Sequence, residues 1–317
     1  MDSQVKQKEK VSILYSHKTK SMVERTANII FFVCAVVAIV AVFAITIYMI
    51  YSGAPALFKV GIVDILFNPV WAPTAEDPSF GILYVILTSI VATSLAILIG
   101  VPIALMTAVF LSEIANTKLA AIVKPAVELL AGIPSVVYGL LGVLMINPVM
   151  YKLEKWIFAD DPNHQFTGGA NLISAVLVLA IMILPTVINV SETSLRAVPQ
   201  QYRSSSLALG ASKIQTIFRV TIPSAKSGII TGVVLGIGRA LGEAMAIVFV
   251  CGNSVNLPFP FNSVRTLTTA IVAEMGYASG LHRQVLFTIG LILFAFIMII
   301  NILLNTILKK GGKQDDK

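Results

Sequence analysis

Long apolar stretches without charge alternate along the chain with short polar segments. Five of them contain no Asp, Glu, Lys or Arg: 26–58, 78–112, 129–151, 162–191 and 284–308. A sixth, 229–251, is interrupted only by Arg239 and Glu243. Because a helix needs about 20 predominantly apolar residues to cross a bilayer, the pattern predicts an all-α membrane protein with six transmembrane helices.

Glycine, proline and polar residues set the predicted boundaries. We expect helices at about 27–51, 81–111, 119–150, 172–193, 229–251 and 285–308. The Gly-Val-Pro at 100–102 is expected to kink the second helix, and "GIPSVVYG" at 132–139 to bend or break the third. The predicted domains are a basic cytoplasmic tail at 1–25, one transmembrane domain at 26–310 and a cytoplasmic tail at 311–317.

Composition and charge add a topology. Of the 317 residues 56% are hydrophobic and 12% charged, and the mean hydropathy is +0.87. The net charge is +7, and most of the 23 Lys and Arg lie in the two tails and the loops 112–124 and 192–228, which share one side if six helices alternate. The positive-inside rule therefore predicts that both termini are cytoplasmic. The excess of basic residues is therefore explained by the orientation of the chain in the membrane, and we expect no nucleic-acid partner.

The chain offers little material for a disulfide framework or a metal site. Cys34 and Cys251 are far apart and lie within or beside apolar stretches. The three histidines are scattered without the spacing of metal ligands. We therefore expect no metal and no disulfide framework.

The most polar internal segment, "QQYRSSSLALGASKIQTIFRVTIPSAKSGI" at 200–229, is patterned as two short helices. Gly210 permits a sharp turn between them, and Pro223 is expected to end the second. An apolar stripe recurs at helical spacing: Leu207, Ile214, Ile217 and Phe218. Such a stripe at the membrane surface either docks a partner protein or rests among lipid headgroups.

The same segment resembles the EAA loop of ABC-transporter permeases, in which E-A-A is followed by three residues, Gly, nine residues and I-x-L-P. Ser204, Ser205 and Ser206 stand at the E-A-A positions, and Gly210 and Pro223 keep the family spacing. Ser204 replaces the family's Glu, so docking by shape is implied without that residue's salt contact. The resemblance implies that this loop docks on a cytoplasmic ATPase through Ser204, Ser205, Ser206, Leu207, Gly210, Ala211, Ile222 and Pro223.

Other segments narrow the resemblance to permeases of phosphate importers. They are "FGILYVILTSIVATSLAILIGVPIALMTAVFLSE", "LLAGIPSVVYGLLG" and "GIGRALGEAMAIVFVCGN". The ending "GEAMAIVFVCGN" and the long first external loop are similar to the PstC type of permease more than to the PstA type. The resemblance covers about residues 25–310 and implies a type I ABC importer permease fold in a bacterial or archaeal plasma (inner) membrane.

The resemblance also implies partners. A second, PstA-like permease would complete the path for inorganic phosphate, a PstB-like ATPase dimer would dock inside, and a PstS-like phosphate-binding protein would deliver phosphate outside. The sequence contains no G-x-x-x-x-G-K-[ST] motif for nucleotide phosphates. We therefore expect this chain to be a transport subunit that binds no cofactor, with ATP and Mg held by the partner ATPase.

Arg239 and Glu243 are the candidate residues of the substrate path. On a continuous helix they would lie one turn apart on one face, about 6 Å apart along the axis. One interpretation is that they neutralise each other so that the helix can insert. The other is that Arg239 contacts phosphate through paired guanidinium donors, while Glu243 accepts the proton that phosphate carries and sulfate lacks. The nearby pair Gly238 and Gly242 is expected to serve helix packing.

Three other classes of function remain as alternatives. A secondary anion transporter could use Arg239 and Glu243 as a relay, but inverted repeats are not evident. An intramembrane enzyme would need a nucleophile and base or a metal cluster, and the apolar stretches contain no histidine apart from His164 at the edge of one. A permease for another oxyanion, such as phosphonate, molybdate or sulfate, would keep the same fold.

Overall fold

The computed structural model describes the backbone of residues 2–312 and the side chains of residues 24–303 and 306. The chain divides into two units, Met1–Ser52 and Gly53–Lys317, and each is considered by itself. The tail predicted at 311–317 lies outside the described residues from 313 onward.

The first unit is a single stretch of helix. It belongs to α1 (Asp2–Val60), so the segment predicted as a separate basic tail continues directly into the first apolar span. The section Glu24–Val60 is long and apolar enough to cross a membrane. Its large side chains are open to the surroundings, with Phe31 70% and Phe32 69% exposed, as expected for a helix solvated by lipid.

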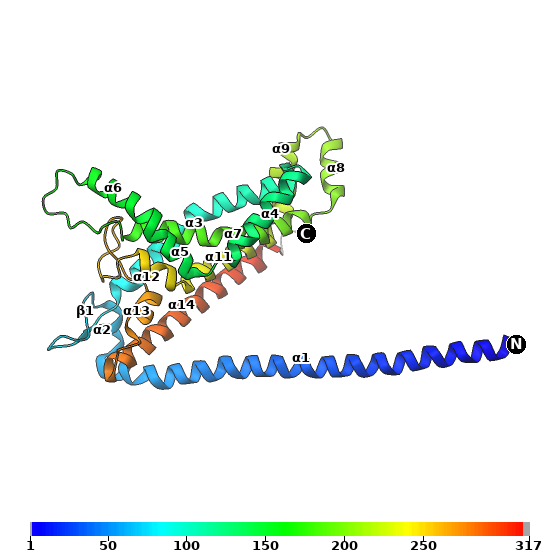
Figure 1. Ribbon diagram of the computed structural model, residues 1–317, viewed down its shortest axis with the longest axis horizontal. Helices are drawn as coiled ribbons and strands as arrows, with labels where there is room; N and C mark the ends of the chain where they lie inside the picture. The colour runs from blue at the N-terminus through cyan, green and yellow to red at the C-terminus, as the bar shows by residue number, and fades with distance from the viewer. Residues whose placement is uncertain (1, 313–317) are drawn as a thin grey trace. The chain divides into compact units, whose positions relative to one another are not determined.

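The second unit contains the other spans (Figure 1). Its first helices are α3 (Leu83–Val109) with the π-helical turn η1 (Phe110–Ile114), α4 (Thr117–Gly132), α5 (Ser135–Leu141) with η2 (Gly142–Ile146), and α6 (Asn147–Ile157). The later ones are α7 (Leu172–Arg196), α11 (Lys226–Gly242), α12 (Met245–Val250), α13 (Leu267–Glu274) and α14 (Gly280–Gly312). In the described part of the chain five helices are long and apolar enough to span a membrane, and a bent pair brings the number to six.

Five of the predicted spans are confirmed in outline. The bent pair is Lys213–Ser224 with Lys226–Gly242, so the predicted span 229–251 is matched only in part, by Lys226–Gly242. α3 runs through Pro102 and continues as η1 to Ile114. The third span breaks between Gly132 and Ser135, where the proline motif predicted it, but reaches Ile157 instead of ending near 150. Tyr138 Oη donates a 2.7 Å hydrogen bond to the Leu130 carbonyl across this break. The same carbonyl also accepts a 3.3 Å hydrogen bond from the Ile133 amide.

The segment before α3 holds the structure expected of so long a loop. A short helix α2 (Ile62–Phe67) precedes the antiparallel strands β1 (Trp71–Ala72) and β2 (Ser79–Phe80), in which Trp71 pairs with Phe80. Ile65 is fully buried in a cluster that includes Leu267 of α13 and Leu286 of α14. These elements lie at the opposite end of the unit from residues 200–224.

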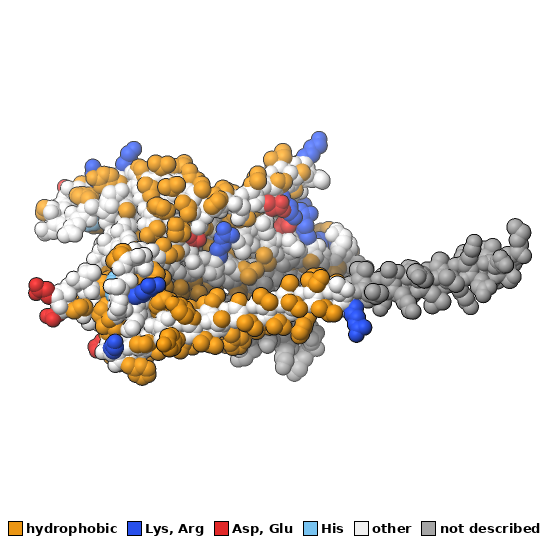
Figure 2. All heavy atoms as spheres, turned by 60° about the horizontal axis from the view of Figure 1, so that its bottom comes forward, with side chains coloured by type: hydrophobic (Ala, Val, Ile, Leu, Met, Phe, Trp, Pro, Cys, Tyr) orange, Lys and Arg blue, Asp and Glu red, His pale blue; other side chains and the backbone are white. Residues whose placement is uncertain are grey.

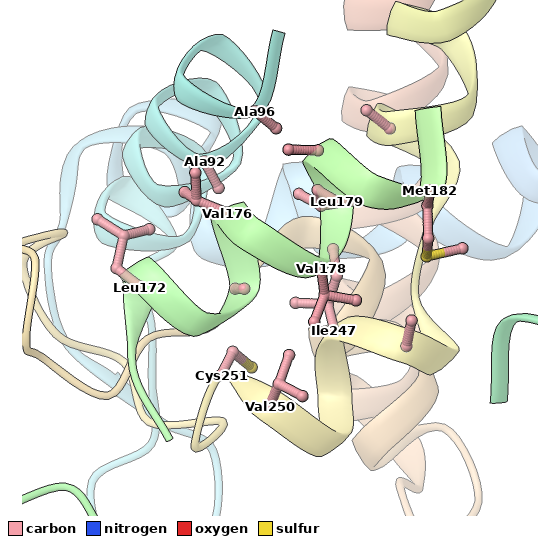
Figure 3. Packing of buried hydrophobic residues seen from close by; sticks show 14 of the residues in the cluster. Ala92, Ala96, Leu172, Val176, Val178, Leu179, Met182, Ile247, Val250 and Cys251 are labelled. Atoms are coloured by element: carbon pink, nitrogen blue, oxygen red, sulfur yellow. The ribbon is translucent and has the colours of Figure 1, made fainter. Parts of the chain in front are cut away.

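The core is built around α7. Figure 3 shows Ala92 and Ala96 of α3 and Val250 of α12 pointing toward side chains of α7. Small residues permit this close approach: a Cβ built on Gly100 would come within 2.8 Å of Ile183 Cδ1. Outside this core hydrophobic side chains cover much of the helical surface (Figure 2), as expected for contact with lipid or another membrane subunit.

Candidate translocation path and coupling surface

The fifth span is not one continuous helix. α11 ends at Gly242, and Glu243 adopts an extended conformation (φ −73°, ψ 126°) before α12 begins at Met245. The prediction that Arg239 and Glu243 share a helix face is therefore wrong. One near and one distant contact hold the break: Glu243 Oε1 accepts a 3.0 Å hydrogen bond from the Ala246 amide, and Thr268 Oγ1 of α13 donates one of 2.7 Å to the Glu243 carbonyl. These contacts satisfy backbone groups that the break sets free.

The two charged side chains have different partners. Arg239 is half-buried on α11, and its Nη1 donates a 3.2 Å hydrogen bond to Thr186 Oγ1 of α7. Among the residues whose side chains are described, Arg239 and Glu243 form no ion pair with each other. In this arrangement Arg239 and Glu243 therefore do not neutralise each other's charge. The guanidinium has five N–H donors, and Thr186 takes one.

The glycines around Arg239 divide between two faces of α11. Added Cβ atoms at Gly232 and Gly236 would meet α7, the first at 3.2 Å from Val190 Cβ and the second at 2.8 Å from Val187 Cγ2. Gly238 and Gly242 have no atom within 4 Å of such a position. Within the described part of this chain Gly238 and Gly242 therefore pack against no other helix, and the part of α11 next to Arg239 presents a small, open surface.

Residues 200–224, hereafter the elbow, form the predicted pair of short helices. α8 (Gln200–Ala208) is followed by Gly210, whose φ of +87° lies in the left-handed region that favours glycine. α9 (Lys213–Thr216), η3 (Ile217–Thr221) and α10 (Ile222–Ser224) follow, starting from a capping box at Ser212. The second limb ends at Ser224 and meets α11 at an angle of 70°.

The elbow exposes a set of large apolar and aromatic side chains. They are Tyr202 (54% exposed), Leu207 (49%), Leu209 (90%), Ile214 (69%) and Phe218 (52%). Ile217, predicted in the same stripe, is instead 3% exposed and packs with Ala108 and Leu195, because η3 turns that side chain toward the bundle. The exposure of the other side chains fits both interpretations that the sequence left open, a surface that docks a partner protein and a segment that rests among lipid headgroups.

The other predicted coupling residues lie along the same segment. Ser204, Ser205, Gly210 and Pro223 are exposed, whereas Ser206, Ala211 and Ile222 are partly buried. Ser204 Oγ bonds only within its own helix, to the carbonyls of Gln200 and Gln201. Ser206 Oγ lies 3.0 Å from Thr216 Oγ1 and joins the two limbs. No single cluster gathers all the predicted residues, but they occupy one continuous elbow.

Ion pairs that could not be predicted from the sequence join α4, α7, α8 and η1 at this end of the unit. Arg203 pairs with Glu113 of η1 at 2.7 Å. Glu192 is 2% exposed and pairs with Lys124 at 3.1 Å and with Arg196. Because Glu192 is buried, its charge must be paired, and these two cations supply the pairing.

A second buried network lies at the other end. The Glu274 carboxylate of α13 pairs with Arg265, accepts hydrogen bonds of 3.1 and 3.2 Å from Trp71 Nε1 and lies 2.7 Å from His282 Nε2. Arg265 also donates to the Asn253 carbonyl. Glu274 is only 4% exposed, so this network is buried and does not belong to a solvated loop.

The comparisons with known proteins agree with this fold. Residues 100–311 match the family described as "Binding-protein-dependent transport system inner membrane component". The chain is 35% identical to the probable ABC transporter permease protein YqgH of Bacillus subtilis, over 92% of this chain and 94% of the relative. It is 36% identical to the phosphate transport system permease protein PstC of Pasteurella multocida, over 78% of this chain and 82% of that relative.

A solved structure shares the architecture. The chain resembles a subunit of a bacterial alginate ABC transporter in complex with its periplasmic protein, with a TM-score of 0.57 and 16% identity over 86% of this chain and 94% of that one. This likeness bears on fold alone. The long apolar helices, the elbow and the match over most of the sequence lead to one conclusion: the chain belongs to the family of binding-protein-dependent transport system inner membrane components.

Proposed function

We propose that this chain is a PstC-type permease subunit that forms half of the translocation path of an ATP-driven importer of inorganic phosphate. Its similarity to PstC proteins over most of the chain supports the cargo. The observation in the molecule that carries the proposal is Arg239. It is a half-buried guanidinium without a carboxylate partner among the described side chains, one turn before the break in a membrane span.

Arg239 and Glu243 recognise different features of phosphate: Arg239 contacts its oxygens, and Glu243 selects for its proton. A guanidinium presents paired donors that match phosphate oxygens. Glu243 keeps one carboxylate oxygen on the Ala246 amide, and its charge selects an anion that still carries a proton near neutral pH. Because ions must leave as readily as they enter, these groups act as transient contacts, and the high-affinity selection belongs to the external binding protein.

The other subunits supply the remaining functions. A PstA-like permease completes the path and a PstS-like protein delivers phosphate from outside. A PstB-like ATPase dimer holds ATP and Mg and docks on the exposed elbow, where Leu209 and Ile214 provide a large apolar surface. The complex lies in the plasma (inner) membrane with both termini of this chain in the cytoplasm, in agreement with the positive-inside rule.

The cargo is tested by substrate-dependent ATP hydrolysis in the purified, reconstituted four-component complex. We expect loaded binding protein to stimulate hydrolysis when phosphate is the ligand, and an excess of sulfate to leave that stimulation unchanged. Glu243→Gln retains an acceptor for the Ala246 amide but removes the charge, and should weaken discrimination against anions without a proton, such as sulfate. Stimulation by sulfate, molybdate or a phosphonate in place of phosphate would assign the permease to another oxyanion.

A further inference from the structure

The first helix of the elbow, α8, stands over a cavity. The space beneath it has a volume of about 670 Å³ and is lined by η1, the end of α7, α8 itself and the start of the second limb. Residues of the lining include Ser112, Gln200, Leu207 and Lys213. Figure 1 shows α8 projecting at this end of the unit. No side chain of α8 is fully buried, so movement of this helix reaches the bundle through the backbone at its two ends and through specific side-chain contacts.

Arg203 supplies most of the polar contacts between α8 and the bundle. On this helix Arg203 and Ser206 are partly buried, and the other side chains are exposed. Arg203 Nη2 lies 2.7 Å from Glu113 Oε1, and its Nε lies 3.2 Å from both carboxylate oxygens. The two side chains are only 13% and 8% exposed. The pair is a forked, charge-assisted contact of the kind that fixes orientation as well as distance.

The same guanidinium also reaches the end of α7. Arg203 Nη2 donates a 2.8 Å hydrogen bond to the Leu195 carbonyl, and Nη1 donates one of 2.6 Å to the Val198 carbonyl. Carbonyls at the end of a helix lack partners within it, and a cation there is favourable. One side chain of α8 thus joins the extension of α3, which carries Glu113, to the central helix α7.

We propose that Arg203, held by Glu113, is the positioning residue that transmits movement of the elbow into α3 and α7. This inference rests on the proposed docking of an ATPase on the elbow. The Arg203–Glu113 ion pair, hereafter the strut, crosses the cavity. When the docked ATPase displaces α8, the strut makes α3 and α7 follow. Without the strut, α8 is joined to α7 mainly through the backbone at residues 197–199 and is no longer held to α3 by Glu113, so less of each ATP hydrolysed is converted into transport.

The test compares transport per ATP hydrolysed in the complete reconstituted complex. Glu113→Gln removes the charge from the strut and keeps an acceptor. Arg203→Lys keeps the ion pair but loses the fork that also holds the α7 carbonyls. Lys118→Met is the matched control, since Lys118 is an exposed cation near the same end of the unit. We expect Glu113→Gln to lower anion uptake per ATP roughly tenfold, the range expected when one charge-assisted hydrogen bond is lost. For Arg203→Lys we expect an uptake per ATP between the values of the parent and of Glu113→Gln. The Lys118→Met control should have the same uptake per ATP as the parent.

Two readouts separate coupling from folding. A purely structural role would reduce the amount of assembled complex and leave the uptake-to-hydrolysis ratio of the remaining complexes at the parent value, which would overturn the proposal. Amide hydrogen exchange in the nucleotide-free complex should be faster at residues 200–209 in Glu113→Gln, and unchanged exchange would also contradict it. If the parent complex imports another oxyanion, the proposed cargo fails but the ratio measured with that anion still tests the strut.

Discussion

Arg239→Gln is expected to lower phosphate uptake by the reconstituted complex about 10- to 100-fold, the loss that follows removal of a hydrogen bond to a charged group. The guanidinium is one of few charges inside a span, and placing such a charge at the centre of a membrane costs about 2.5–3.5 kcal/mol. Glutamine retains an N–H donor toward Thr186 Oγ1, the hydrogen-bond partner of Arg239 Nη1. Packing between α11 and α7 should therefore survive while the interaction with the anion is lost.

The experiment measures initial rates of labelled-phosphate uptake beside the yield of assembled complex. Arg239→Lys restores the charge without the planar fork and should recover part of the rate. Arg283→Gln removes an exposed cation of the second unit and controls for net charge. Uptake at the parent rate by Arg239→Gln, with normal assembly, would show that Arg239 does not contact the transported ion.

Glu274→Ala is expected to destabilise the chain by about 3–5 kcal/mol, because removal of one partner leaves the buried charge of the other uncompensated. Arg265 is 13% exposed and His282 9% exposed, so water cannot replace the carboxylate. Trp71 Nε1 loses its acceptor in the same step, which frees the β1–β2 segment from α13. In a chain of this size the loss corresponds to a fall in the unfolding midpoint on the order of 10 °C.

Thermal unfolding of the purified complex in detergent tests this prediction. The double variant Arg265→Ala with Glu274→Ala removes both charges and should regain part of the lost stability. Glu76→Gln, at an exposed position before β2, is the control and should leave the midpoint unchanged. A single Glu274→Ala variant as stable as the parent would mean that this network is solvated in the protein.

The sequence predicted the features that depend on local pattern. Apolar length predicted the spans, the proline motif at 132–139 predicted the break before α5, and Gly210 predicted the turn of the elbow. These signals are carried by neighbouring residues, so no knowledge of tertiary contacts is needed to use them. Resemblance to a family then implied that the elbow docks a partner protein, which stays a prediction.

Features that depend on distant partners could not be predicted. Glu113 and Arg203 are separated by 90 positions, and neither residue carries a sign of the other in its local sequence. The break at Glu243 depends partly on Thr268, which contributes its hydroxyl from α13. Periodicity alone favoured a continuous helix there, and for that reason it placed Arg239 and Glu243 on one face. Ile217 was assigned to the exposed stripe because a π-helical turn was not anticipated.

The central claim is that this chain forms half of a membrane path driven by a separate ATPase. The most direct measurement is uptake of labelled phosphate into proteoliposomes that contain both permeases, the ATPase dimer and loaded binding protein outside. We predict accumulation only when ATP and Mg are enclosed on the ATPase side, and none when the ATPase is omitted. ATP-independent accumulation by this chain, or its failure to associate with an ATPase subunit, would contradict the account.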